Sequence, residues 1–348
     1  MKNNILLLLL LATSFFACER AILGLETENT PINNFELFWK TYDEHSSIIF
    51  PKQINWDSIY QVYRPSVSNA TTEAELWTIF TEMIEVFDDE HTLLYDPIAD
   101  QTYVSGSQGI DIAMQSFSKA LLDEKYLAYR TIIETAPDFS YGKIKDKSIG
   151  YIYIGDSDGN HPEQTIDEIL EVLGELEAII VDVRNNGGGS ASFMKPIANA
   201  FATEDRLAYT VQDRIGINHD DFSEPSAVYT NYDGINQYTK PVILLTDRFS
   251  VSAAEDFTLH MKVIEQVTHI GDTTAGAFSQ TSPQQFLPNG WTYQYPVQLE
   301  LTPEGVCLEG IGVIPEIAVE NTPQDIENQQ DKIMERAIRY LFETYGIR

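Results

Sequence analysis

The hydrophobic pattern of residues 34–96 predicts three short helices that pack together. An aromatic-rich helix opens at Phe35, and a second runs over residues 56–63. The third has the clearest signature, because Thr72 and Glu75 form a capping box ahead of apolar residues at helical spacing. We therefore expect an N-terminal helical subdomain.

Beyond residue 97 the pattern changes to short apolar runs that alternate with helical stretches. Continuous apolar runs of this length are typical of strands buried on both faces of a sheet. The runs and stretches are strands at 149–154, 178–183 and 241–245, helices at 163–173, 192–203 and 252–263, and a closing helix at 325–345. Strand alternating with helix predicts an α/β fold, with the core over residues 97–348.

The first residues have the pattern of a secretory signal peptide. Lys2 precedes the apolar run 5–11, which is too short to cross a bilayer, and a small residue follows at Ala17. The next residue is Cys18, an order similar to that of a bacterial lipobox. We expect residues 1–17 to be a signal peptide, Cys18 to carry the lipid, and residues 18–33 to form a tether. The resemblance implies a location in the bacterial cell envelope, on the periplasmic or surface side; ordinary secretion with an incidental cysteine is the alternative.

The charge changes the picture by excluding classes of partner. The 348 residues hold 22 Lys and Arg against 53 Asp and Glu, a net charge of −31. So negative a surface repels phosphate backbones and anionic headgroups, so we expect no nucleic-acid partner and no membrane contact beyond the lipid. Two cysteines cannot form a disulfide scaffold. Residues 156–160 resemble the start of a calcium loop, but His161 stands where glycine is required, so we expect no metal and no cofactor.

Three loops carry possible chemistry. Gly187 to Gly189 follow a predicted buried strand, where they suit an anion-binding turn, an oxyanion hole or merely a tight turn. Ser252 follows another buried strand and opens a helix, whose N-terminus stabilises negative charge; helix capping is the alternative. His91 follows an acidic cluster after the third helix, where a structural role is the alternative.

Taken together, the loops resemble the C-terminal-processing and tricorn-type serine peptidases of family S41. The resemblance rests first on the helix at residues 56–57, the end of the third helix at 89–92 and the strand 149–154. It also rests on the motifs at residues 182–189, 250–255, 271–276 and 309–316, with Ser252 at the reactive position. The resemblance covers nearly the whole chain after the signal peptide. It implies a core of the ClpP/crotonase-like type. It also implies a peptide or unfolded protein as substrate.

One departure decides the branch that the chain resembles. The C-terminal-processing branch uses a Ser–Lys dyad, but Ala277 occupies the lysine position and Lys262 does not match the motif. The chain instead resembles the tricorn branch, which has a Ser–His–Glu arrangement. The resemblance implies that Ser252, His91 and Glu309 fill these three roles here. The remaining expected site residues are Gly188 and Ala253 as oxyanion-hole donors, and Gly187, Gly189, Ser190 and Gly276 as substrate-loop candidates. Residues 95–148 are too few for a PDZ domain with its connections.

These observations predict a cell-envelope serine endopeptidase that hydrolyses peptides or unfolded protein segments. A catalytically inactive protein on the same scaffold, binding a peptide or a hydrophobic ligand, is the main alternative, because fold does not fix function. A hydrolase of non-peptide esters with the same nucleophile is a third reading. The sequence predicts no oligomeric state.

Overall fold

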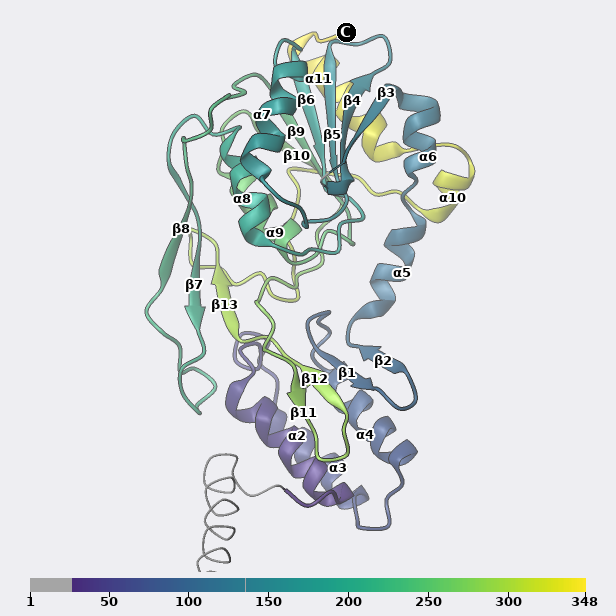
Figure 1. Cartoon of the computed structure of the whole chain (residues 1–348), viewed down its shortest axis with the longest axis vertical. Coiled ribbons are helices and arrows are strands. Elements are labelled where there is room, and N and C mark those ends of the chain that lie inside the picture. Colours follow the sequence, from purple (N-terminus) through teal and green to yellow (C-terminus); the bar gives the residue numbers. More distant parts are fainter. Residues whose placement is uncertain (1–26, 135) are drawn as a thin grey trace, which may run out of the picture.

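The computed structural model describes residues 27–134 and 136–348 (Figure 1). The predicted signal peptide, Cys18 and most of the predicted tether lie outside the described residues. The N-terminal helices are α2 (Pro31–His45), α3 (Trp56–Tyr63), the 3₁₀ turn η1 (Arg64–Ser66) and α4 (Glu73–Glu85). The capping box of α4 is confirmed, since Thr72 Oγ1 accepts the Glu75 N–H and Glu75 Oε2 accepts the Thr72 N–H.

The core is a seven-stranded mixed sheet in the order β14-β10-β9-β6-β5-β4-β3. Its strands are β3 (Leu127–Ile133), β4 (Ala136–Ile144), β5 (Ile149–Ile154), β6 (Ala178–Asp182), β9 (Val242–Thr246), β10 (Val267–Gly271) and β14 (Ile317–Ala318). The neighbouring strands β5, β6, β9, β10 and β14 run parallel to one another. At one edge β4 pairs antiparallel with β5, and β3 pairs antiparallel with β4. This mixed α/β architecture confirms the predicted fold class.

Helices cover both faces of this sheet (Figure 1). One face packs against α7 (Pro162–Leu173), α8 (Ala191–Asn199) and α9 (Ala253–Lys262), through Ile152 and Ile154 of β5 among others. The alternate side chains of the same strand, such as Tyr151, face α11 on the other side. Because both faces are covered, β5, β6 and β9 are buried along their whole length, as their continuous apolar runs predict.

A segment from late in the chain completes the N-terminal subdomain. A four-stranded antiparallel sheet, β11-β12-β1-β2, packs on α2, α3 and α4. Its strands are β1 (Leu93–Asp96), β2 (Gln101–Val104), β11 (Gln285–Phe286) and β12 (Thr292–Gln294). Tyr42 of α2 donates its hydroxyl to the Gln294 carbonyl, 3.1 Å away. The predicted division at residues 96 and 97 therefore does not account for residues 285–295, which share the aromatic core of the first three helices.

The remaining elements connect these two parts. A three-stranded sheet, β13-β7-β8, lies beside the core and is formed by β7 (Arg206–Asp213), β8 (Ser226–Thr230) and β13 (Gln298–Leu301). The helices α5 (Ser107–Gln115) and α6 (Lys119–Leu121) and the π-helical turn η2 (Leu122–Tyr126) lead from β2 back to the core (Figure 1). No helix within residues 27–134 and 136–348 is long and apolar enough to span a bilayer.

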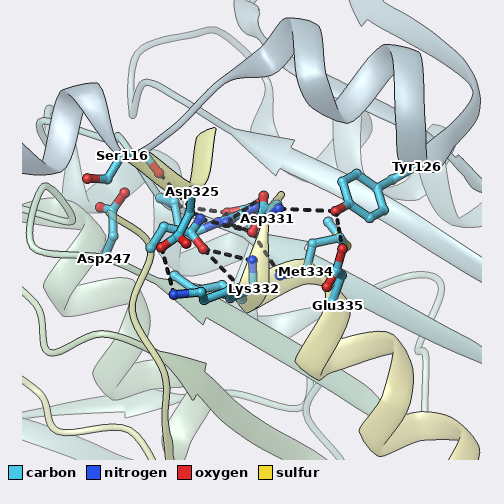
Figure 2. Close-up of polar contacts among 12 residues, drawn as sticks. Ser116, Tyr126, Asp247, Asp325, Asp331, Lys332, Met334 and Glu335 are labelled. Atoms are coloured by element: carbon cyan, nitrogen blue, oxygen red, sulfur yellow. Dashed lines mark hydrogen bonds and ion pairs between the residues drawn. The ribbon is translucent and has the colours of Figure 1, made fainter. Parts of the chain in front are cut away.

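The predicted closing helix over 325–345 is wrong in its first part. It is divided into α10 (Pro323–Glu327) and α11 (Lys332–Tyr345), because Asp331 caps α11 by accepting the Met334 N–H at 3.0 Å. Figure 2 shows Asp331 at the centre of a polar network that includes Tyr126 and Glu335. The buried Arg184 joins this network through two hydrogen bonds to the Asp331 carboxylate, at 2.8 and 2.9 Å.

Candidate active site

Ser252 stands at the junction between β9 and α9 in an unusual backbone conformation. Its φ of 56° and ψ of −121° lie outside the regions that a residue with a side chain normally occupies. The backbone is held there because the Ser252 N–H donates to the Ala277 carbonyl at 3.1 Å. Such strain is concentrated at functional sites, and here it presents a half-exposed serine at a helix N-terminus.

The glycine loop lies directly against Ser252. A Cβ added at Gly188 would lie 2.7 Å from the Ser252 Cβ and 3.3 Å from its Oγ. Only glycine leaves room for the serine, and the Gly188 φ of +96° favours glycine as well. Asn186 joins the two loops, because its carbonyl accepts the Val251 N–H at 3.0 Å. The carboxyl ends of the adjacent strands β6 and β9 bring these loops together.

One of the two expected oxyanion-hole donors is already engaged in this structure. The Gly188 N–H donates to Asn186 Oδ1 at 2.8 Å, so this structure does not offer it to a substrate oxygen. Ala253 is the first residue of α9, where an N–H has no acceptor within the helix. Ala253 therefore remains a candidate donor, whereas Gly188 contributes space for the nucleophile.

A pocket of about 630 Å³ opens beside Ser252. Its lining residues are Asp158, Gly189, Ser190, Ala191, Tyr209, Val211, Ser252, Ala253, Asp256, Phe278, Gln280, Gln298 and Glu300. Two of the predicted substrate-loop residues, Gly189 and Ser190, are thus at the pocket. The other two are not in its lining: Gly187 lies against Phe249, and Gly276 packs against the backbone of Ile311.

The segment that carries the lysine of the dyad enzymes is held by a carboxylate. Glu255 accepts hydrogen bonds from the Thr274 hydroxyl at 2.6 Å and from the backbone N–H groups of Gly276 and Ala277 at 2.7 and 2.8 Å. Ala277 itself is fully buried. Lys262 lies at the far end of α9, where it contacts the Ile314 carbonyl. Neither the Ala277 position nor Lys262 therefore supplies a base to Ser252.

The predicted base is carried on a segment that contacts the nucleophile loop. Glu90 pairs with Arg248 at 4.0 Å. The same guanidinium donates to the carbonyls of Thr274 and Ala275. This contact brings the segment that carries His91 close to the nucleophile loop.

The environment of His91 keeps its imidazole neutral. Burial lowers the pKa of His91 below its usual value, while the nearby Asp89 acts in the opposite direction. Asp89 is fixed by the Thr92 hydroxyl, which donates to it at 2.8 Å. The His91 Nδ1 atom is buried and has no hydrogen-bond partner among the described residues. An uncharged imidazole with a free ring nitrogen is the form that a general base requires.

Glu309 lies close to the same segment. One carboxylate oxygen, Oε1, accepts the N–H and the hydroxyl of Ser279 at 2.8 and 2.6 Å. Burial and then the charge of Asp89 raise the pKa of Glu309 to about 7. Lys52 contacts both the Asp89 segment and the Glu309 segment. Its ammonium group donates to the carbonyls of Phe87 and Asp88, and its side chain lies against Gly310. The second oxygen of Glu309, Oε2, is buried and has no donor within the described ranges.

The structure places Glu309 near the segment that carries His91, and it links neither residue directly to Ser252. Across residues 27–134 and 136–348, no hydrogen bond is present between Ser252 Oγ, the His91 ring and the Glu309 carboxylate. Hydrogen bonds in active sites without substrate are often long and shorten only when substrate binds. Asp89 acts on both His91 and Glu309, so these two predicted residues share one charged neighbour.

Comparison with known proteins identifies the family. Residues 148–319 match Peptidase family S41, and residues 29–85 match the Tricorn protease C1 domain. A solved structure of a candidate peptidase from Parabacteroides merdae is 31% identical, with a TM-score of 0.82, over 90% of this chain and 97% of that one. The chain belongs to peptidase family S41. The motif resemblance is thereby confirmed at the level of the family.

Two curated S41 relatives show how far the likeness extends. The Tricorn protease of Thermoplasma volcanium is 26% identical over 64% of this chain and 20% of its own length. The Carboxy-terminal processing protease CtpB of Bacillus subtilis is 28% identical over 51% of this chain and 35% of its own length. The chain therefore spans about a fifth to a third of the length of these relatives.

Sequence reasoning missed several residues of the site. Asp256 lies four residues after Ser252, a spacing that places both on one helix face, so this residue could have been found from the predicted helix. Glu300 comes from β13 and Ser279 from an irregular loop, and neither follows a recognisable motif. Only the folded chain places these two beside the site.

Proposed function

We propose that the protein is a serine endopeptidase that hydrolyses peptides or unfolded protein segments, with Ser252 as its nucleophile. The observation that carries the proposal is the conformation of Ser252, held with a positive φ at the N-terminus of α9 beside the pocket. Family membership supports this reaction class. Gly188 supports it too, since its missing side chain leaves Ser252 accessible.

The proposed mechanism assigns the proton to His91. Neutral His91 takes the proton of the Ser252 hydroxyl as its oxygen attacks the substrate carbonyl, and later gives it to the leaving amine. Glu309 stabilises the imidazolium that forms, directly or through Ser279. The Ala253 N–H and the N-terminus of α9 stabilise the negative oxygen of the intermediate.

The proposal is tested by incubating the purified protein with a permanently unfolded protein, such as reduced and carboxymethylated casein. New peptide termini should appear by mass spectrometry and should be absent with a Ser252→Ala protein prepared in parallel. A chain that leaves unfolded proteins intact but hydrolyses simple esters would support the ester-hydrolase reading instead.

Replacing Glu309 by glutamine should change the pH dependence of activity. Glu309 has a pKa raised to about 7, and the pKa of His91 lies below its usual value. Both residues act in the deprotonated form, so kcat/KM should rise with pH as each loses its proton. In Glu309→Gln only His91 remains, and the acid limb should move to lower pH, with kcat reduced about 10-fold or more. The matched control is Glu304→Gln, an exposed glutamate five residues away, which should leave the profile unchanged. An acid limb that keeps its position in Glu309→Gln would exclude this role.

We also propose that the protein is held in the cell envelope by a lipid on Cys18. The support is the sequence order alone, a signal-like segment followed directly by cysteine. A lipidated Cys18 would anchor the folded domain at a membrane surface. Cys18→Ser should move the protein from the membrane to the soluble fraction of cells. Unchanged fractionation, with no acyl mass on the mature protein, would contradict the anchor.

A further inference from the structure

Two buried carboxylates lie in the pocket beside Ser252 and have no assigned role. Asp256 of α9 is 6% exposed and Glu300 of β13 is 8% exposed, and both line the pocket. The two carboxyl groups hydrogen-bond to each other, and Asp256 Oδ1 and Glu300 Oε2 accept no hydrogen bond from any other described residue. Asp256 is one helical turn beyond Ser252, so the pair lies on the pocket side of the nucleophile's own helix.

The pocket supplies no positive charge to this pair. Its described lining contains no Lys, Arg or His, and Asp158 adds a further acid. Two other buried carboxylates of the chain do have a cationic partner, since Arg184 joins both Asp182 and Asp331. Buried acids without a cationic partner are rare in proteins because desolvation is costly. A pair of buried carboxyl groups without a cation therefore suits a positive group that arrives from outside.

We propose, building on the proposed peptidase function, that Asp256 and Glu300 form a specificity pocket for a lysine or arginine side chain of the peptide residue whose carbonyl Ser252 attacks. The ring of Tyr209 and the side chains of Val211 and Phe278 offer apolar surface to the long methylene stem of such a residue. The two carboxylates then face the charged end.

The pKa values of the two carboxyl groups fit a site in which the substrate supplies the missing positive charge. Burial raises the pKa of Asp256 to about 7, and burial together with Asp256 raises the pKa of Glu300 well above its usual value. Glu309, Glu255 and Tyr209 also face the pair and add no positive charge. The free site thus keeps a proton between the two carboxyl groups, and a bound cation would displace it.

A divalent metal ion is the competing occupant. Metal sites of this kind normally use more than two protein ligands. No group of three or more Cys, His, Asp or Glu residues with suitable geometry is found in the described part of the chain. The occupant that fits is therefore an extended cationic side chain that enters the pocket from a peptide bound at Ser252.

The test compares peptides that differ at one residue, with lysine, norleucine or glutamate before the cleaved bond. Wild type should cleave the lysine peptide with a kcat/KM about 30-fold or more above that for norleucine, and the glutamate peptide least. Glu300→Gln and Asp256→Asn should each lower the lysine-to-norleucine ratio toward one. Glu265→Gln, an exposed carboxylate just after α9, is the matched control and should keep the wild-type ratio. A wild-type ratio of one, or unchanged ratios in both pocket variants, would overturn the proposal.

A binding measurement separates failure of the pocket from failure of the peptidase. Benzamidine, a small aromatic cation, should bind to Ser252→Ala in calorimetry and release a proton, seen as a heat that depends on the buffer. The added change Glu300→Gln should abolish this binding, while thermal unfolding shows that the variant is folded. Benzamidine binding without any peptide cleavage by the wild-type protein would support the cation pocket and contradict the proposed peptidase function. Cleavage of norleucine peptides without benzamidine binding, or binding of Mg²⁺ or Zn²⁺ in its place, would leave the peptidase and exclude the pocket.

Discussion

Alanine at Ser252 or at His91 is expected to lower peptide turnover by about 10⁴-fold or more. The nucleophile and its base act in one proton transfer, so losing either removes the same step. The double variant should therefore be little worse than either single variant. Initial rates with a fluorogenic peptide, measured for the four proteins at equal concentration, check this result.

His45→Ala is a suitable control for the histidine variant, because His45 is an exposed residue at the end of α2. It should retain wild-type activity. Full activity in His91→Ala would exclude His91 as the base. No activity in any form, including wild type, would favour the alternative in which the S41 fold binds a peptide or hydrophobic ligand without cleaving it.

Alanine at Gly188 is expected to lower kcat/KM by about 10²-fold. The added methyl group would stand 2.7 Å from the Ser252 Cβ, a distance that two carbon atoms cannot share, so the nucleophile or the glycine loop must shift. Even a small displacement of Ser252 Oγ from its position for attack on the substrate carbonyl lowers the rate. The measurement is kcat/KM on the same fluorogenic peptide, with thermal unfolding to show that the variant folds.

Gly290→Ala isolates the steric part of this effect. Gly290 has a φ of +92°, close to the +96° of Gly188, but a Cβ there would have no atom within 4 Å. Both variants therefore strain the backbone, while only Gly188→Ala crowds Ser252. Activity lost equally in both variants would show that strain, and not the contact with Ser252, explains the result.

Features set by local sequence could be predicted. The apolar runs of β5 and β9 and the capping box of α4 depend on neighbouring residues, and they appear at the expected places. Ser252 and the glycine loop follow adjacent parallel strands, β9 and β6, whose ends must meet at one edge of the sheet. The nucleophile region is thus readable from the order of strands and loops.

Features set by contacts between distant segments could not be predicted. The aromatic core of the N-terminal helices includes Trp291 and Tyr293, which follow those helices by about two hundred residues and show no matching pattern. Glu300 reaches the pocket only because β13 pairs with β7 in a separate sheet. The Gly188 N–H was expected to face a substrate, but the nearby Asn186 side chain accepts it, which depends on a rotamer that the sequence does not specify.

The central claim, that Ser252 is an activated nucleophile, is tested most directly with a fluorophosphonate probe. Wild-type protein should gain the mass of one phosphonyl group, and peptide mapping should place it on Ser252. His91→Ala should react far more slowly, and Ser252→Ala should not react. A wild-type protein that remains unmodified under conditions that label a known serine peptidase, or an adduct on another residue, would contradict the account.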